Sequence, residues 1–218
     1  DKALDFKNAE IHEAAQYGMD ALLKAQFPNG AFPQVWTKPV EAHPVLKPGF
    51  PEYDWRTENK VNDYWNLYTL NDYNSGYVLR ALMEAHQVYK EDKYKTAIEK
   101  LGDFLILAQM PDPQPAWCQQ YTFDMKPSWA RKFEPPAITS WESQDVMETL
   151  MKISAYTGNK KYLEPIPAAL EYLKRLVLPD GRLARFYELK TSKPLYMDKT
   201  YQLTYDDSAA PVHYGWKQ

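Results

Sequence analysis

Apolar residues recur at helical spacing in several segments of this sequence, and this periodicity limits the fold more than any other feature. The segments are 9–27, 74–90, 92–110, 141–157 and 160–177. The sequence shows no long alternation of apolar and polar residues, the pattern that indicates a half-buried strand. Short turns separate the later segments, so neighbouring helices should form antiparallel hairpins. We therefore expect an all-α fold.

Three of the expected helices end in the same way. Each stops at a proline, and a run that mixes polar and aromatic residues follows. The prolines are Pro28, Pro111 and Pro179, and the runs are 31–34, 116–120 and 183–188. Such a repeat supports a closed ring of hairpins, in which equivalent ends lie on one rim. The three runs should then meet at one cleft, unless the repeat is a coincidence in a proline-rich chain.

Length and charge limit the class of protein. The 218 residues suffice for one domain of ordinary size. The formal net charge is −3 with basic and acidic residues well mixed, whereas a nucleic-acid surface shows clustered excess lysine and arginine. No stretch approaches the roughly 18 consecutive apolar residues of a membrane span. We expect a monomer that binds neither nucleic acid nor membrane.

Aromatic residues are frequent for so polar a chain. Phe, Trp and Tyr make up 15% of the residues, with 17 Tyr and 7 Trp. Many lie in the long connection 35–73, where their density argues against disorder. Such rings are either half-buried amphipathic side chains or surfaces that stack on sugars. Composition alone leaves both interpretations open.

The sequence contains none of the common catalytic or metal-binding motifs, such as GxSxG, a P-loop, HExxH or paired CxxC. The histidines, His12, His43, His86 and His213, lack the spacing of zinc ligands. The single Cys118 cannot form an intramolecular disulfide and is expected to be a small buried side chain. The notable polar residues are Arg, Asp, Asn and Gln beside aromatic rings, which suits binding and deprotonating a sugar acid.

The segment 126–136, centred on Arg131, and its continuation to Ser143 resemble the arginine-bearing signature of the all-α pectate lyases, polysaccharide lyase family 10. Further stretches that resemble this family, in the same order, are 28–34, 70–72, 116–121 and 185–188. The resemblance implies an α/α-toroid core, calcium-assisted β-elimination on polygalacturonate, and a secreted or periplasmic location. It also implies that residues 1–218 are a single toroid domain without the family's N-terminal helical segment.

The chemistry of β-elimination explains the residue types independently. A proton leaves C5 of a uronate while the glycosidic oxygen departs from C4. That proton is not acidic while the neighbouring carboxylate is ionised, so cations must neutralise the carboxylate and the enolate-like charge that develops. Arginine forks and calcium both match carboxylate oxygens.

The resemblance assigns roles to individual residues. It makes Arg131 the catalytic base, although a guanidinium normally keeps its proton, so a mainly electrostatic role is the alternative. Arg185 and Lys199 would bind substrate carboxylates, and Asp72 would hold calcium. The other expected substrate-binding residues are Asn71, Trp117 and Tyr187.

Structural roles compete with these assignments. Arg131 would commonly form an ion pair with Glu134 or Glu142. Asp72 stands where it would also cap the following helix. Lys199 replaces an arginine of the family pattern, which exchanges a bidentate fork for a point charge.

Two other functions stay open at this point. One is a sugar-binding domain that has lost the elimination chemistry. The other is a glycoside hydrolase, which requires two facing carboxylates, and Asp54 and Asp145 are candidates without a recognisable motif.

Overall fold

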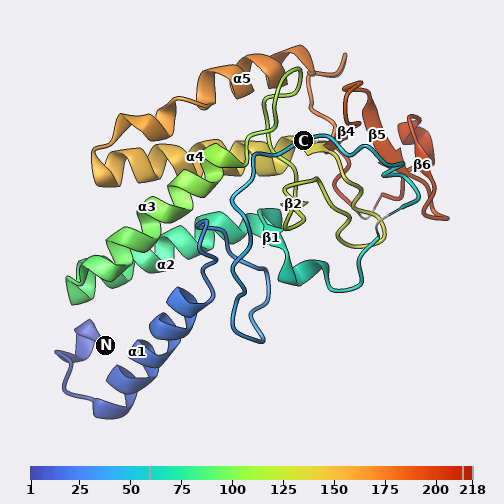
Figure 1. The fold of residues 1–218 in the computed structure, drawn as a ribbon. Helices are drawn as coiled ribbons and strands as arrows, with labels where there is room; N and C mark the ends of the chain where they lie inside the picture. Colours follow the sequence, from blue (N-terminus) through green and yellow to red (C-terminus); the bar gives the residue numbers. More distant parts are fainter. Residues whose placement is uncertain (59, 213, 218) are drawn as a thin grey trace.

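A computed structural model describes residues 1–58, 60–212 and 214–217 (Figure 1). Its α-helices are α1 (Ala9–Lys24), α2 (Asn74–Tyr89), α3 (Asp92–Leu107), α4 (Ser140–Thr157) and α5 (Ile166–Arg175). Its 3-10 helices are Lys2–Leu4, Tyr64–Asn66, Asn71–Tyr73, Lys160–Leu163 and Asp207–Ala209. The helical segments expected from the periodicity are confirmed. The last one splits at Pro165, since proline suits the first turn of α5 but cannot continue the preceding helix.

The prediction of an all-α toroid is wrong, because antiparallel sheets accompany these helices and make the fold mixed α/β. One sheet pairs β1 (Tyr68–Thr69) with β2 (Gln120–Tyr121). The other has the order β3 (Ile138–Thr139), β4 (Phe186–Tyr187), β5 (Pro194–Met197) and β6 (Leu203–Thr204). Most of these strands span two residues, and β1 to β4 are buried on both faces. No alternating pattern can reveal such strands in the sequence.

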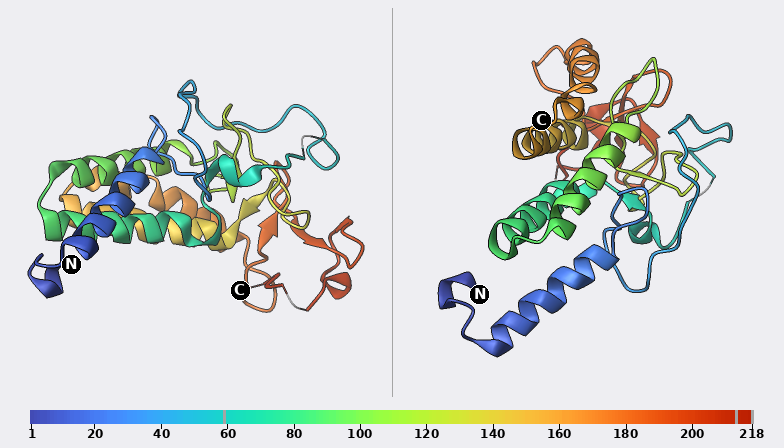
Figure 2. Two further views of the ribbon diagram at one scale, coloured as in Figure 1. Left: turned by 90° about the horizontal axis from the view of Figure 1, so that it is seen from below. Right: turned by 60° about the vertical axis from the view of Figure 1, so that its left-hand side comes forward.

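The core lies between α2, α3 and α4, which pack against one another (Figure 2). The first helix, α1, has no buried residue and diverges from this bundle in the right-hand view of Figure 2, although Met19, Leu22 and Leu23 near its end pack against the core. None of the helices in the described ranges has the length and apolar character needed to cross a membrane. The bundle therefore serves as the support from which the loops and sheets extend.

Backbone pairing links the three polar-aromatic runs through intervening strands, and not on the rim of the closed ring that the repeat predicted. The amide of Thr69 in β1 donates to the carbonyl of Phe32 (3.0 Å), and β1 pairs with Gln120 in β2. In the second sheet, Ile138 bridges to Cys118 on one side and pairs with Tyr187 on the other. Segments far apart in the sequence thus form one buried layer at the end of the bundle.

The second and third runs are equivalent in their hydrogen bonds. The hydroxyl of Tyr121 donates to the carbonyl of Ala108 (2.8 Å) and accepts from a backbone amide three residues earlier (2.9 Å). The hydroxyl of Tyr187 likewise donates to Leu176 (2.8 Å) and accepts from Ala184 (2.8 Å). Each tyrosine therefore fastens a loop to the end of the helix before it.

The first run begins at a glycine that no other residue can replace cheaply. Gly30 has φ of +96°, in the region that favours glycine. A Cβ atom at this position would collide with the backbone carbonyl of Lys100 in α3. Close packing of the turn on α3 therefore requires this residue.

Candidate active site

Arg131 is held by a buried carboxylate at the end of the helical bundle. Its Nε donates to Glu134 Oε2 (2.8 Å) and its Nη2 to Glu134 Oε1 (2.5 Å). Its backbone amide donates to the same carboxylate (3.1 Å). The Glu134 side chain is fully buried, whereas 39% of the Arg131 side chain is exposed. This fork fixes the guanidinium and leaves one edge open to a ligand.

The hydrogen bonds that Arg131 donates to Glu134 raise the pKa of Arg131 further above its ordinary range. Arg131 is therefore fully protonated in this arrangement, and an ion pair with Glu134 is present, as the structural alternative predicted. A protonated guanidinium cannot remove a proton, but it can neutralise a carboxylate. The geometry thus favours the electrostatic role over the role of base.

Asp72 lies on the open edge of Arg131. Its Oδ1 is 3.6 Å from Nη2 of Arg131, and its Oδ2 accepts from the amide of Gln34 (2.9 Å). The backbone of Asp72 is left-handed, with φ of 55°, and its amide donates to the side chain of Asn71 (2.9 Å). The first turn of α2 has no side-chain cap. Asp72 is therefore turned toward the arginine, and its alternative role as a helix cap is not found.

A second arginine–carboxylate pair lies behind the first. Arg185 Nη2 is 3.3 Å from Glu142 Oε1, and only 12% of the Arg185 side chain is exposed. Burial raises the pKa of Glu142, and among the described residues neither Oε2 of that carboxylate nor Nε of Arg185 has a hydrogen-bond partner. The guanidinium lies 4.8 Å from the ring centre of Tyr214. Arg185 thus belongs to the site, but deep inside it.

Gln119 joins the two pairs. Its buried amide nitrogen lies within hydrogen-bond distance of Asn71 Oδ1 (3.1 Å), Glu142 Oε1 (3.3 Å) and Glu134 Oε1 (3.5 Å). An amide has only two hydrogens, so three acceptors share them. Asn71, expected to bind substrate, is buried in this network and supports the backbone of Asp72 instead.

Tyr214 is a further link that the sequence did not suggest. Its hydroxyl donates to Glu134 Oε1 (2.9 Å), and its ring faces Arg185. Burial raises the pKa of Tyr214, and the nearby charge of Glu134 adds to this shift. The phenol therefore stays neutral and acts as a donor between the two arginine pairs.

A model of the pectic acid lyase family matches residues 4–182 of the sequence. The chain belongs to this family. By family it is a lyase, and the resemblance noted in the sequence is confirmed. None of the curated protein sequences compared matches the chain.

Two solved structures of family 10 polysaccharide lyases from Cellvibrio cellulosa are similar in fold. One is a mutant in complex with trigalacturonic acid, with 20% identity and a TM-score of 0.69 over 95% of this chain and 68% of that chain. The other has 21% identity and a TM-score of 0.66 over 90% of this chain and 65% of that chain. This pectic acid lyase family member thus spans about two thirds of their length.

Two residues expected to bind substrate are structural in this family member. Trp117 is fully buried, and its indole donates to the carbonyl of Leu105 (2.8 Å). Tyr187 is 1% exposed and holds its loop through the hydroxyl contacts described above. Neither ring is open to a sugar, because each fills the core and satisfies backbone groups.

Lys199 lies at the edge of the site. It is exposed in the connection between β5 and β6. It lines a cavity of about 370 Å³ together with Phe133, Tyr201 and Tyr214. Tyr214 also contacts Glu134, so this cavity adjoins the arginine network.

The fit of calcium is poor in this arrangement. Within the described ranges, no group of three or more His, Cys, Asp or Glu side chains is placed to hold a metal ion. Calcium takes six to eight oxygen ligands. Asp72 supplies one carboxylate, and that carboxylate already faces a cation. His213, one of the histidines considered as a zinc ligand, lies outside the described residues.

Proposed function

We propose that the chain cleaves polygalacturonate or a related polyuronide by β-elimination, with Arg131 as the residue that neutralises the uronate carboxylate. The supporting observation is the guanidinium fork held by buried Glu134, with one edge exposed beside Asp72. Family membership supports the reaction type.

The order of events follows from the charges. Asp72 is half-exposed and 3.6 Å from Arg131, so a uronate carboxylate displaces it at little cost. The guanidinium, which Glu134 holds in place, then lies against the carboxylate into which negative charge spreads as solvent hydroxide takes the C5 proton. The glycosidic oxygen leaves C4 and takes a proton from water, so that a C4–C5 double bond remains. Because Glu134 already fixes the cation, little reorganisation is needed in the transition state.

The test is the absorbance of the unsaturated sugar end that elimination creates. We expect the purified chain to raise ultraviolet absorbance on polygalacturonate, and Arg131→Ala to lower the rate at least 100-fold, the usual loss when one stabilising donor is removed. Arg80→Ala is the matched control, because Arg80 lies on the surface of α2 and pairs with Glu84. Absence of product with every polyuronate tested would reject the proposal. Full activity of Arg131→Ala would reject the role of that residue.

The glycoside hydrolase alternative gains no support from its candidate carboxylates. Asp54 accepts from the backbone and side chain of its own turn, at Arg56 (3.2 Å) and Thr57 (3.0 Å). Asp145 lines a groove between α2 and α4. A product with a new reducing end but no unsaturation would nevertheless show hydrolysis.

Calcium dependence is a separate proposal. Because the described side chains do not form a calcium site, the ion would take most of its oxygen ligands from uronate carboxylates, with Asp72 as the protein ligand. We expect activity to rise with calcium at about 0.1–1 mM, the range of weak sites, and to fall with EDTA. Asp72→Asn should raise the calcium concentration required. Activity that is indifferent to EDTA would reject the proposal.

We also propose that the protein acts outside the cytoplasm, because polymeric pectate cannot enter a cell. Fractionation of the producing cells should find it in the medium or the periplasm, and a purely cytoplasmic location would contradict this.

A further inference from the structure

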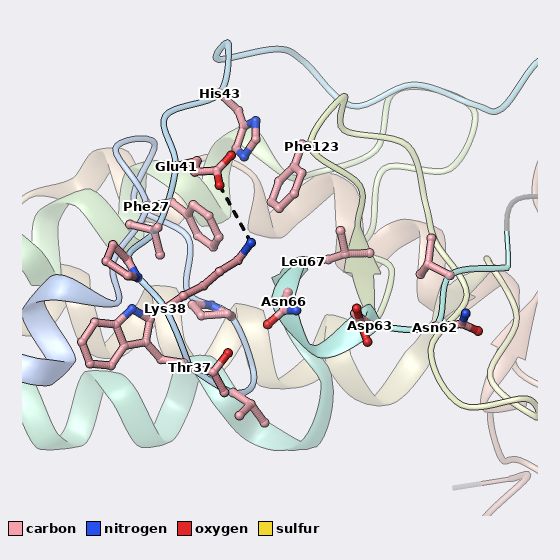
Figure 3. A pocket seen from close by; sticks show the side chains of 16 residues that line it. Phe27, Thr37, Lys38, Glu41, His43, Asn62, Asp63, Asn66, Leu67 and Phe123 are labelled. Carbon is pink, nitrogen blue, oxygen red and sulfur yellow. Dashed lines mark ion pairs between the residues drawn. The ribbon is translucent and has the colours of Figure 1, made fainter.

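A cavity of about 470 Å³ lies beside the active site, and the elimination chemistry does not use it (Figure 3). Its size falls within the range of about 300–1,000 Å³ that is usual for small-ligand pockets. Its walls come from the end of the first run, from residues 35–43 and 61–67 of the long connection, and from Phe123 after β2.

Gln34 connects the wall of this cavity to Asp72, which faces Arg131. Pro33 and Val35 line the cavity, and Gln34 between them donates its amide to Asp72 (2.9 Å). The backbone amide of Gln34 donates to the carbonyl of Trp65 (2.9 Å), which fixes this wall. A polymer that places a uronate on Arg131 therefore passes close to the cavity.

One side of the cavity is aromatic. His43 and Phe123 stack with ring centres 3.8 Å apart, and Phe27 lies 5.7 Å from Phe123. Figure 3 shows these three rings near one another on one side of the cavity. Trp36 also lines the cavity and is 37% exposed. Flat apolar surfaces of this kind match the C–H face of a pyranose ring.

The polar groups of the cavity carry no excess positive charge. The ammonium of Lys38 is 3.8 Å from the carboxylate of Glu41, the ion pair drawn in Figure 3. Asp63 adds an unbalanced carboxylate, and Asn62 and Asn66 add amides. This set offers donors and acceptors to hydroxyl groups. A second uronate carboxylate would gain little here, in contrast to the guanidinium of the active site.

We propose that this cavity is a subsite for an uncharged sugar unit of the polymer, either a neutral pyranose or a uronate whose carboxyl is esterified. The inference rests on the proposed function, because it assumes that the same polymer reaches Arg131. It deepens that function by defining the substrate as a polyuronide with uncharged units near the bond that is cleaved.

Monosaccharide probes test the subsite without turnover, since they have no glycosidic bond at C4 to eliminate. The probes are methyl galactoside, the methyl ester of methyl galacturonide, and free methyl galacturonide, titrated by saturation-transfer NMR. We expect the first two to bind at least 10-fold more tightly than the free acid. Comparison of the first two distinguishes a neutral sugar from an esterified uronate. Equal or tighter binding of the free acid would overturn the proposal.

Two variants locate the binding in the cavity. Trp36→Ala removes the exposed ring and should weaken both uncharged probes about 10-fold, whereas Tyr17→Ala, an exposed ring on α1, should change neither. Asp63→Lys reverses one charge of the lining and should reverse the preference toward the free acid. Unchanged affinities in both Trp36→Ala and Asp63→Lys would overturn the proposal.

Arg131→Ala separates failure of the subsite from failure of the proposed function. This variant should lose elimination on polygalacturonate and keep wild-type affinity for the uncharged probes. Elimination without probe binding would reject the subsite alone, and probe binding without elimination by the wild type would reject the lyase reaction alone.

Discussion

The two arginine–carboxylate pairs of the active site share their chemistry and differ in their surroundings. Glu134 binds Arg131 through both carboxylate oxygens, and 39% of that arginine side chain is exposed. Glu142 meets Arg185 through one contact of 3.3 Å, and 12% of that arginine is exposed. Both carboxylates are buried. A buried anion can thus serve two purposes, to aim a cation at solvent or to balance a charge inside the protein.

The difference also concerns how well the charges are satisfied. Glu134 accepts from Arg131 and from Tyr214, whereas Glu142 Oε2 and Arg185 Nε lack partners among the described residues. Buried ion pairs add little stability when geometry is imperfect, yet removal of one member is costly. Under the proposed function, the first pair therefore serves catalysis and the second supports the site.

The largest expected effect on stability comes from breaking the more buried pair, Arg185 and Glu142. Glu142→Ala leaves Arg185 buried without a counter-ion, which should lower the free energy of unfolding by about 3–5 kcal/mol. Urea unfolding measures this loss. The control is Glu148→Ala on the same helix, whose carboxylate is exposed and pairs with Lys152. If both variants lose little free energy of unfolding, and by equal amounts, Arg185 is not a buried charge that depends on Glu142.

Substitution of Arg131, in the more exposed pair with Glu134, should lower activity strongly and stability only slightly. Arg131→Lys keeps the charge but loses the fork, so kcat should fall about 100-fold to 1,000-fold. The free energy of unfolding should change by less than about 1 kcal/mol, because a half-exposed cation is retained.

The pH–rate profile of Arg131→Lys then separates the two roles of the arginine. If residue 131 acts as a cation, activity should fall as pH rises through the lysine pKa of about 10.4. If it acts as the base, activity should rise through that pKa.

Asp145 sharpens the comparison, because it is a buried carboxylate one turn along α4 from Glu142 and, among the described residues, has no arginine partner. Burial raises its pKa to about 6, with a further contribution from nearby Glu148 and Glu142. Its protonated form is favoured by folding, so its contribution to stability is full below about pH 4 and is lost as pH rises through about 6.

Asp145→Asn cannot ionise and should be more stable than the wild type by about 1–3 kcal/mol at pH 7, and equal to it at pH 4. Thermal unfolding at the two pH values checks this. A difference that does not vary with pH would exclude ionisation of Asp145 as its cause.

The smallest effect is expected where the two pairs touch. Tyr214→Phe keeps the ring beside Arg185 and removes the hydrogen bond to Glu134, which should cost about 0.5–1.5 kcal/mol. kcat should fall only a few-fold, because Arg131 still holds Glu134 by its fork. A loss as large as that of Arg131→Lys would mean that Tyr214 takes part in the reaction.

The helices were predictable because their burial repeats every three to four residues along the chain. The strands were not, since they are mostly two residues long and each partner comes from a distant segment. The spacing of apolar residues within one segment carries no information about pairing with a distant segment. Short buried strands therefore turned an expected all-α fold into a mixed one.

The site was predictable where a residue stands in a distinctive run. Arg131, Arg185 and Asp72 do, and the structure brings them together through Gln119 and Glu134. The run 116–121 pointed to the region of Gln119 but not to its contacts.

Other members of the site were missed or misassigned for physical reasons. Tyr214 was missed, because its contact with Glu134 joins segments far apart in the chain. Trp117 and Tyr187 were wrongly expected to bind substrate, because an aromatic ring with a polar atom can contact either a sugar or the end of a helix. In this structure the polar atoms of both rings donate hydrogen bonds to carbonyls near helix ends.

Gly30 affects how such chains should be recognised in genomes. Its place against the backbone of α3 is required by packing, so we expect a glycine at this position in any relative that keeps this architecture, including one that no longer cleaves a substrate. Resemblance in the run 28–34 is therefore evidence of a shared fold and not of a shared reaction. A search for catalytically active relatives should instead ask whether an arginine lies three residues before a buried glutamate, as Arg131 does before Glu134.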